Sequence, residues 1–180
     1  MNAAGGPSIL PLAAFLVFYA GQRLAELALS ARHTRALLAR GGRETGRAHF
    51  PFLVALHSVF PLALAAEVVL ARTRPGALAP LWFAAWLAAQ LLRFASMRAL
   101  GGRWTARVIV VPGEPRVTGG VYRWLPHPNY LAVAVEFLAG PLMLGAWRTA
   151  IVFSLADLPA LWVRIRCEER ALADSGATAA

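Results

Sequence analysis

Hydrophobic residues along this chain gather into five continuous segments, and the stretches between them are rich in arginine and glycine. The approximate bounds of the apolar segments are 8–29, 52–71, 78–97, 130–146 and 149–163. A helix of roughly 20 apolar residues crosses the ~30 Å hydrocarbon core of a bilayer. The pattern therefore predicts an all-α integral membrane protein with about five transmembrane helices. The last two segments are short and flank the turn at Gly145–Arg148, so they are expected to form a short antiparallel hairpin.

The stretches outside these segments complete a single membrane-embedded domain over residues 1–180. The longest is a loop at 98–129, in which Arg107–Val111 is expected to form a short strand or an interfacial strip. Residues 174–180 are small and polar, which is typical of a flexible tail. The N-terminus lacks a basic stretch before its apolar run, so the first segment is expected to be a retained span rather than a cleaved signal peptide.

Composition and charge agree with a membrane protein and indicate its orientation. Of the 180 residues, 58% are hydrophobic, and the mean hydropathy is +0.55. All 18 basic residues are arginines, and most lie in alternate inter-segment stretches. The positive-inside rule then predicts a multi-pass protein of the bacterial cytoplasmic membrane, with its N-terminus outside and its C-terminus in the cytoplasm. These arginines are expected to contact membrane lipid rather than nucleic acid.

Two polar clusters border the last two apolar segments on the expected cytoplasmic side. The first is Gly120–Tyr130, in which His127 stands between two prolines and Asn129 is a candidate helix N-cap. The second is Arg164–Arg170. Polar groups at membrane depth are costly without a function or a partner, so the clusters predict a functional site. The alternative for the first is a capped helix end with an interfacial His and Tyr.

Charged residues inside the apolar segments allow both a functional and a structural interpretation. Glu136 is expected to be either a site residue or the partner of Arg93, Gln90 or Arg23. On the first helix, Arg23 is expected to pair with Glu26. On the last, Arg164 and Glu168 are spaced for a surface pair, while Glu169 faces elsewhere and is able to point into the hairpin mouth.

The same residues exclude some kinds of site. The four histidines have no metal-ligand spacing and Cys167 is the only cysteine, so we predict no metal and no internal disulfide. No phosphate-cradling glycine motif and no serine nucleophile elbow is present.

The combined pattern of the second half of the chain resembles the isoprenylcysteine carboxyl methyltransferase family. It comprises Gly120, Tyr122, Arg123, His127, Pro128, Tyr130, Glu136, Pro141, Glu168, Glu169 and Leu172. The likeness is closer to the short bacterial branch, which includes alkylpyrone and alkylresorcinol O-methyltransferases. One departure is Pro126, which stands where the family usually has an arginine and so removes a cation near the cofactor site.

The resemblance implies an S-adenosylmethionine-dependent methyltransferase with its active site at the cytoplasmic ends of the last two helices. The cofactor-binding residues it implies are His127, Pro128, Tyr130, Glu168 and Glu169. The implied catalytic residues are Arg123 and Arg164, which would orient the acceptor oxygen or the cofactor carboxylate, and Glu136, which would hold polar groups of the cofactor or balance its sulfonium.

The acceptor that the resemblance implies is a lipophilic molecule, methylated on a phenol, enol or carboxylate oxygen. A polyketide synthase that makes such a lipid is the protein partner this interpretation predicts. Two alternatives remain open. One is an NADPH-dependent membrane enone or sterol-type reductase, because such enzymes carry a similar His-Pro-Asn-Tyr segment. The other is a non-catalytic helical membrane subunit.

Overall fold

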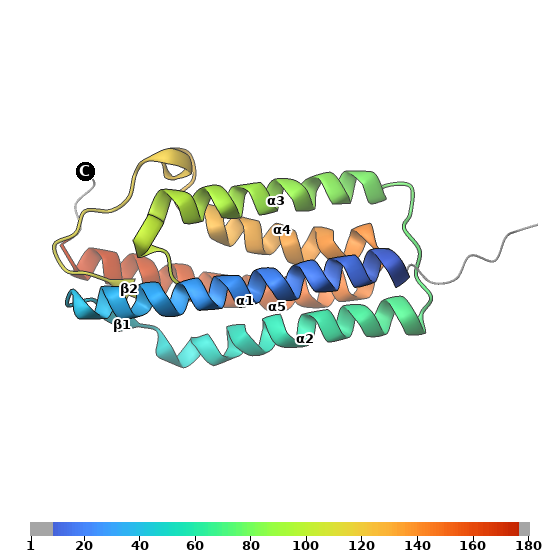
Figure 1. The fold of residues 1–180 in the computed structure, drawn as a ribbon, viewed down its shortest axis with the longest axis horizontal. Helices are drawn as coiled ribbons and strands as arrows, with labels where there is room; N and C mark the ends of the chain where they lie inside the picture. The colour runs from blue at the N-terminus through green and yellow to red at the C-terminus, as the bar shows by residue number, and fades with distance from the viewer. Residues whose placement is uncertain (1–8, 177–180) are drawn as a thin grey trace, which may run out of the picture.

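Residues 9–176 of the computed structural model are described here, and helices dominate them (Figure 1). The long helices are α1 (Ile9–Ala39), α2 (Phe50–Leu70), α3 (Ala79–Leu100), α4 (Pro128–Met143) and α5 (Trp147–Asp174). Short elements lie between them: strands β1 (Arg43–Thr45) and β2 (Val108–Val110), and the 3-10 turns η1 (Arg47–His49), η2 (Gly101–Arg103) and η3 (Gly120–Arg123).

Each predicted apolar segment lies on one helix, but two helices run well beyond their segments. Helix α1 continues to Ala39, and α5 continues to Asp174. Hydropathy marks only the apolar part of a helix, so a polar extension beyond it is not visible in that pattern. The expectation of two short final helices is thus wrong for α5, whereas the 16 residues of α4 span only about 24 Å. Of the expected tail, Asp174 ends the helix, and 177–180 lie outside the described residues.

The fold is not purely α-helical, because β1 and β2 form a two-stranded antiparallel sheet. Arg43 pairs with Val110, and Thr45 pairs with Val108. The Arg107–Val111 stretch therefore forms a strand, one of the two conformations expected for it. Its partner was not predicted, because three residues after a pair of glycines carry no alternating pattern. The sheet ties the end of α1 to the long loop.

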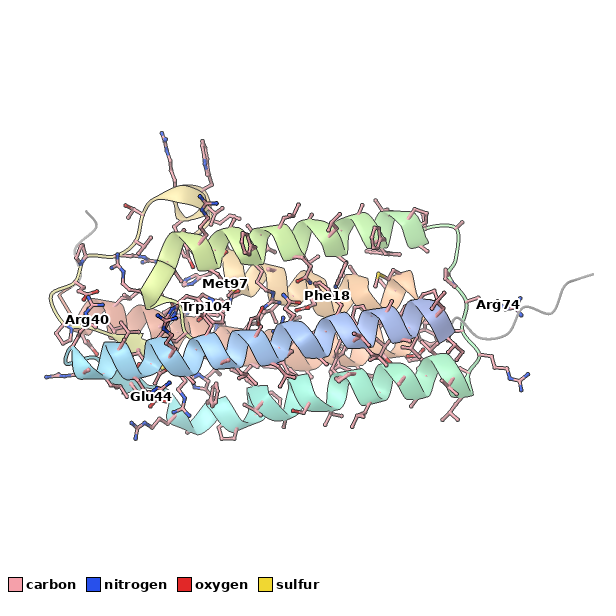
Figure 2. The ribbon with its side chains drawn as sticks, viewed as in Figure 1. Phe18, Arg40, Glu44, Arg74, Met97 and Trp104 are labelled. Carbon is pink, nitrogen blue, oxygen red and sulfur yellow. The ribbon has the colours of Figure 1, made fainter. Side chains whose placement is uncertain are left out.

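The helices run lengthwise in one bundle, and consecutive helices alternate in direction (Figure 1). One end, here called the loop end, holds β1, β2, the 101–127 loop and the C-terminal part of α5. The other end, called the hairpin end, holds the α2–α3 and α4–α5 connections. Figure 2 shows Arg40 and Glu44 at the loop end and Arg74 at the hairpin end. All three arginine-rich stretches thus lie at the same end, as the predicted topology requires.

A cluster of aromatic side chains packs the helices together. Phe60 of α2 is fully buried and meets Phe137 of α4 edge-on, with ring centroids 4.8 Å apart, and Phe153 of α5 at 5.3 Å. Phe15 and Tyr19 extend the cluster onto α1, and Tyr19 donates a hydrogen bond to the His57 carbonyl at 3.2 Å. Edge-to-face pairs of this kind add to the energy of apolar burial.

The outer surface of the bundle is also apolar. On α3, the exposed side chains Phe83, Leu87, Leu91 and Phe94 form a stripe, and α1, α2 and α5 carry similar ones. Two of the described helical stretches, Ile9–Ala39 and Arg47–Leu70, are long and apolar enough to cross a membrane, with hydropathies of 1.4 and 2.0. An apolar exterior of this extent is typical of a membrane or protein contact surface. Five spans remain a prediction, because α3 and α5 carry internal charges and α4 is short.

Helices α4 and α5 form the predicted antiparallel hairpin. Gly145 in the turn has φ +77°, and a Cβ there would lie 2.2 Å from the Arg74 carbonyl oxygen. Only glycine accepts both this backbone conformation and this close approach. Glu67 of α2 caps the start of α5: its carboxylate accepts hydrogen bonds from the Arg148 and Thr149 amides at 3.1 and 2.6 Å. This polar residue therefore has a structural partner.

Candidate functional site

His127 lies at the loop end, immediately before α4, and its imidazole reaches α5. Helix α4 begins at Pro128, which is fully buried and supplies the fixed φ favoured at a first helical position. Nε2 of His127 lies 2.9 Å from Oε1 of Glu169, and its ring stacks on Tyr130 with centroids 5.4 Å apart. Asn129 was the predicted N-cap, but His127 occupies that position. The two polar clusters predicted from the sequence therefore meet.

Tyr130 links Arg164 to Glu168. Its hydroxyl donates a hydrogen bond to Glu168 Oε2 and accepts one from Arg164 Nε at 3.0 Å. A second guanidinium nitrogen of Arg164 donates to the Ala106 carbonyl at 2.6 Å. No direct ion pair between Arg164 and Glu168 is found. The expected surface pair is wrong, because Arg164 turns into the bundle and is buried.

Glu169 joins His127 to the long loop through Arg116. The Arg116 guanidinium donates two hydrogen bonds to the Glu169 carboxylate, at 2.8 and 3.2 Å. Sequence reasoning treated Arg116 only as a topology signal and missed this role. The adjacent Glu168 and Glu169 were the available signal, since two carboxylates close to a cofactor site favour a cationic partner. Arg116 also provides a cation near the position where Pro126 replaces the usual arginine.

Glu136 lies in a buried ion cluster between α1, α3 and α4. It accepts hydrogen bonds from Arg93, from Arg23 at 3.2 Å and from Gln90 at 3.2 Å. Arg23 also pairs with Glu26 at 3.0 Å, as predicted. With 2% of its surface exposed, Glu136 lines neither cavity described below. Glu136 was expected to be either a site residue or the partner of Arg93, Gln90 or Arg23. The structure shows it paired inside the bundle with all three.

Arg123 lies apart from the other predicted site residues. Its side chain is exposed and packs over the Trp124 ring, with 5.4 Å from guanidinium carbon to centroid. It lines neither cavity. Nothing in this arrangement supports the catalytic role that the resemblance implied for Arg123, because the η3 turn carries it outward.

Two cavities meet at the loop end of the bundle. The first, called the loop cavity, has about 990 Å³ of space, open to solvent, between β2, the following loop and the facing ends of α4 and α5. The second, called the helix cavity, has about 900 Å³ between α1, α2, α4 and α5. The residues that line both are Trp104, Thr105, Asn129, Tyr130 and Arg164.

The segment that separates the cavities is fastened to the helices on both sides. His33 Nδ1 of α1 lies 2.7 Å from the Trp104 carbonyl, and Ser30 Oγ accepts a hydrogen bond from the Ala106 amide at 2.9 Å. Arg164 holds the same segment from α5. Figure 2 shows Trp104 beside the loop-end half of α1. The shared wall is therefore a fixed part of the bundle.

The loop cavity has the chemistry that S-adenosylmethionine requires. Its lining combines arginines for a carboxylate, Glu168 for cationic groups, and the aromatic rings of Tyr122 and Tyr130 for a sulfonium or a base. Nε1 of Trp104 and Oδ1 of Asn129 are buried without a hydrogen-bond partner, so the wall offers one spare donor and one spare acceptor. His127, Tyr130 and Glu168 line this cavity, whereas Pro128 and Glu169 do not.

Tyr122 contributes a neutral phenol to this cavity. Burial and the neighbouring Glu168 carboxylate raise the pKa of Tyr122 above its ordinary value, although Arg116 opposes the shift. Its hydroxyl therefore stays protonated at neutral pH and is able to donate a hydrogen bond. Among residues 9–176, no group of three or more His, Cys, Asp or Glu side chains is arranged to hold a metal ion.

Comparison with known proteins identifies the family. Residues 82–174, which hold α4, α5 and the lining of the loop cavity except Leu37, match the isoprenylcysteine carboxyl methyltransferase (ICMT) family. The chain belongs to this family. This match confirms the resemblance drawn from the His127 and Glu168–Glu169 motifs. ICMT proteins are membrane methyltransferases.

Two relatives of this ICMT chain are bacterial proteins described as uncharacterized. The uncharacterized protein YpbQ of Bacillus subtilis (strain 168) is 36% identical over 155 residues, which cover 84% of this chain and 90% of that protein. An uncharacterized protein of Haemophilus influenzae is 27% identical over 151 residues, or 83% and 88% of the two chains. No solved structure matches the chain significantly.

Proposed function

We propose that this ICMT protein transfers the methyl group of S-adenosylmethionine to an oxygen of a lipophilic acceptor at the cytoplasmic face of a bacterial inner membrane. The observation that carries the proposal is the junction of the two cavities. The loop cavity is the more polar of the two and faces the loop end, where a soluble cofactor has access. The helix cavity is mainly apolar and lies within the bundle, where a lipid has access. They share the wall of Tyr130, Arg164, Asn129 and Trp104.

The loop cavity is the proposed cofactor site. When bound, S-adenosylmethionine supplies an electrophilic methyl group on a sulfonium, which suits direct displacement by an oxygen nucleophile. His127, Tyr130 and Glu168 line the wall nearest the junction, and Glu169 with Arg116 fixes the imidazole of His127. Such a reaction requires alignment and the exclusion of water more than covalent help from the protein.

The helix cavity is the proposed acceptor site. Leu27 of α1 and Val54 of α2 line it and are 50% and 45% exposed, so the cavity reaches the outer surface between these helices. A lipid is thus able to enter sideways from the bilayer. Phenols, enols such as pyrones, and carboxylates are the acceptor oxygens proposed. A lipid-producing polyketide synthase is the proposed source of a phenol or enol.

At the junction, the chain orients the acceptor oxygen and accepts its proton. Arg164 presents a fixed guanidinium that attracts a phenolate, enolate or carboxylate oxygen. Tyr130 lines both cavities, and its hydroxyl already donates to Glu168. A proton from a phenol or enol can therefore pass through the Tyr130 oxygen to the Glu168 carboxylate. A carboxylate acceptor needs no such transfer at neutral pH.

Cofactor binding is the first test. Binding of S-adenosylmethionine, and separately of NADPH, would be measured by calorimetry on detergent-purified protein. The variants His127→Ala and Glu168→Ala remove cavity-lining groups, and Arg98→Ala is a matched control, because Arg98 is an exposed arginine at the same end. We expect the wild type and Arg98→Ala to bind S-adenosylmethionine at micromolar concentrations, and both cavity variants to bind at least tenfold more weakly.

Other outcomes would decide between the alternatives. Binding of NADPH in place of S-adenosylmethionine would favour the reductase. If neither binds, even with a membrane lipid extract present, the non-catalytic subunit becomes the better interpretation. Incorporation of a labelled methyl group into the lipid extract, released again by acid but not by mild base, would indicate an enol ether rather than an ester.

A further inference from the structure

The outward face of α5 changes character along its length. From the hairpin end it presents exposed apolar side chains at Ile151, Val152, Leu155 and Leu158. Near the loop end the face continues with Trp162, Arg166 and Arg170, which follow one another at four-residue spacing and are all exposed. An apolar band that ends in a tryptophan and then arginines is the usual pattern where a helix leaves the hydrocarbon for the headgroup layer.

A groove runs along this face, between α5 and the β1–η1 segment. Its space, including the part open to solvent, is about 1180 Å³, and Thr45, His49, Trp162, Arg166 and Arg170 line it. The segment approaches α5 closely because position 46 is glycine: a Cβ there would lie 2.1 Å from the His49 ring and 2.6 Å from the Cys167 sulfur. The groove shares no lining residue with the loop cavity or the helix cavity.

The groove has cationic and hydrogen-bonding groups without partners. Within residues 9–176, neither Arg166 nor Arg170 forms an ion pair; Arg166 lies over the Trp162 ring at 5.5 Å. The hydroxyl of Thr45 is buried and has no hydrogen-bond partner. Asp174, one helical turn beyond Arg170, is the one carboxylate in the lining against two arginines. An anion is therefore the complementary ligand.

We propose that this groove binds one anionic phospholipid of the cytoplasmic leaflet. The phosphate lies between Arg166 and Arg170. The acyl chains lie along the apolar band from Trp162 toward Ile151. A phospholipid is the ligand that needs both features, since a small anion uses only the arginines and a neutral lipid uses only the band. The site is separate from the methyl-transfer cavities and does not depend on their chemistry.

The test compares two arginine pairs at the same end of the protein. Purified protein would be delipidated in mild detergent and titrated with phosphatidylglycerol or phosphatidylcholine, and bound lipid would be counted by native mass spectrometry. Arg166→Gln/Arg170→Gln removes the proposed site. Arg32→Gln/Arg98→Gln is the matched control, which removes two exposed arginines that have no ion pair in the described chain.

We expect one phosphatidylglycerol per wild-type and per control protein, and little phosphatidylcholine. The groove variant should bind phosphatidylglycerol about 30-fold more weakly, since an arginine near an anionic lipid contributes roughly fivefold in affinity. If both variants bind phosphatidylglycerol equally weakly, the effect is one of overall charge and the proposal is wrong. Unchanged phosphatidylglycerol binding by the groove variant would also overturn it. Displacement of the lipid by glycerol phosphate at equal concentration would point instead to a soluble phosphate. The thermal unfolding temperature of the groove variant, compared with that of the wild type, reports separately on folding.

Discussion

The Tyr130 hydroxyl lies 3.0 Å from Nε of Arg164, and it simultaneously donates a hydrogen bond to Glu168. One side chain thus fixes both a cation and a carboxylate at the only wall that the loop and helix cavities share. Tyr130 is therefore the residue at which cofactor binding and acceptor binding are expected to be coupled.

Replacing Tyr130 with phenylalanine separates these two functions. The ring still stacks on His127, so the affinity for S-adenosylmethionine should change by less than threefold. Without the hydroxyl, Arg164 loses an orienting partner and the proton path to Glu168 is interrupted. Methyl transfer to a phenol or enol should then fall roughly 100-fold, a typical effect of losing one acid–base group. Turnover and cofactor affinity would be measured on the same preparation.

The acceptor provides an internal control for this variant. A carboxylate acceptor needs no proton removal, so its methylation should fall less than that of a phenol. If the variant loses cofactor affinity as severely as turnover, Tyr130 would be a binding residue only, and the proposed proton path would be wrong.

Arg116 should matter for cofactor affinity although it lies on a loop. It pairs with Glu169, which in turn holds His127. Arg116→Gln removes the charge but keeps a hydrogen-bond donor, and we expect about tenfold weaker cofactor binding with little change in thermal stability. The stability effect is small because the pair is largely solvated, and surface pairs contribute about 0–1 kcal/mol. Arg98→Gln is the comparison, because Arg98 is an exposed arginine at the same end that lines neither cavity; equal losses in both variants would indicate a general charge effect.

Most of the helical fold, and the meeting of the two polar clusters around His127 and Glu169, could be predicted from the sequence for physical reasons. Polar residues such as His127 and Glu168 stand out because they lie at the ends of apolar segments. A polar group near the hydrocarbon is costly unless it has a partner or a function. Helix direction followed from arginine placement in the loops. These signals are local, or repeat along one helix.

The contributions of Arg116 and Trp104 could not be predicted, because both depend on the path of the 98–129 loop. Trp104 forms part of the shared wall only because His33, Ser30 and Arg164 fasten the segment around it. Arg123 was misleading for the converse reason: it belongs to the motif, yet the turn before α4 directs it outward. The spacing of residues along the sequence predicts where a side chain points only inside a regular helix, and not in a loop such as 98–129.

Glu136 should be essential for stability rather than for the reaction. Glu136→Ala leaves Arg93 and Arg23 with Glu26 as their remaining carboxylate, and loss of one partner of a buried pair typically costs about 3–5 kcal/mol. Unfolding monitored in detergent should show this loss, while cofactor affinity measured on the folded fraction stays within threefold. Glu136→Gln keeps the hydrogen-bond acceptor and should lose less. If Glu136→Gln has normal stability but no turnover, Glu136 would be a catalytic residue after all, and the structural interpretation would be wrong.

Glu67 offers a stability test at the opposite end of the bundle. Its carboxylate accepts hydrogen bonds from the first amides of α5 and from the Thr149 hydroxyl at 2.6 Å. A negative charge at a helix start is favoured both by the unsatisfied amides and by the helix dipole. Glu67→Ala should therefore destabilise the protein by about 1–2 kcal/mol, measured by thermal unfolding.

The Glu67 variant also tests how far the hairpin end is coupled to the site. Helix α5 carries the Glu67 cap at its first turn and Arg164 four turns later, so fraying of the first turn should leave the junction intact. Cofactor affinity is thus expected to stay unchanged at temperatures where the variant is folded. Thr149→Val removes only the hydroxyl contact and should cost less than half as much. A different result would be tenfold weaker cofactor binding by Glu67→Ala with an unchanged unfolding temperature. It would mean that α5 shifts as one rigid helix. The contact of α5 with α2, rather than the cap at its first turn, would then determine the position of Arg164.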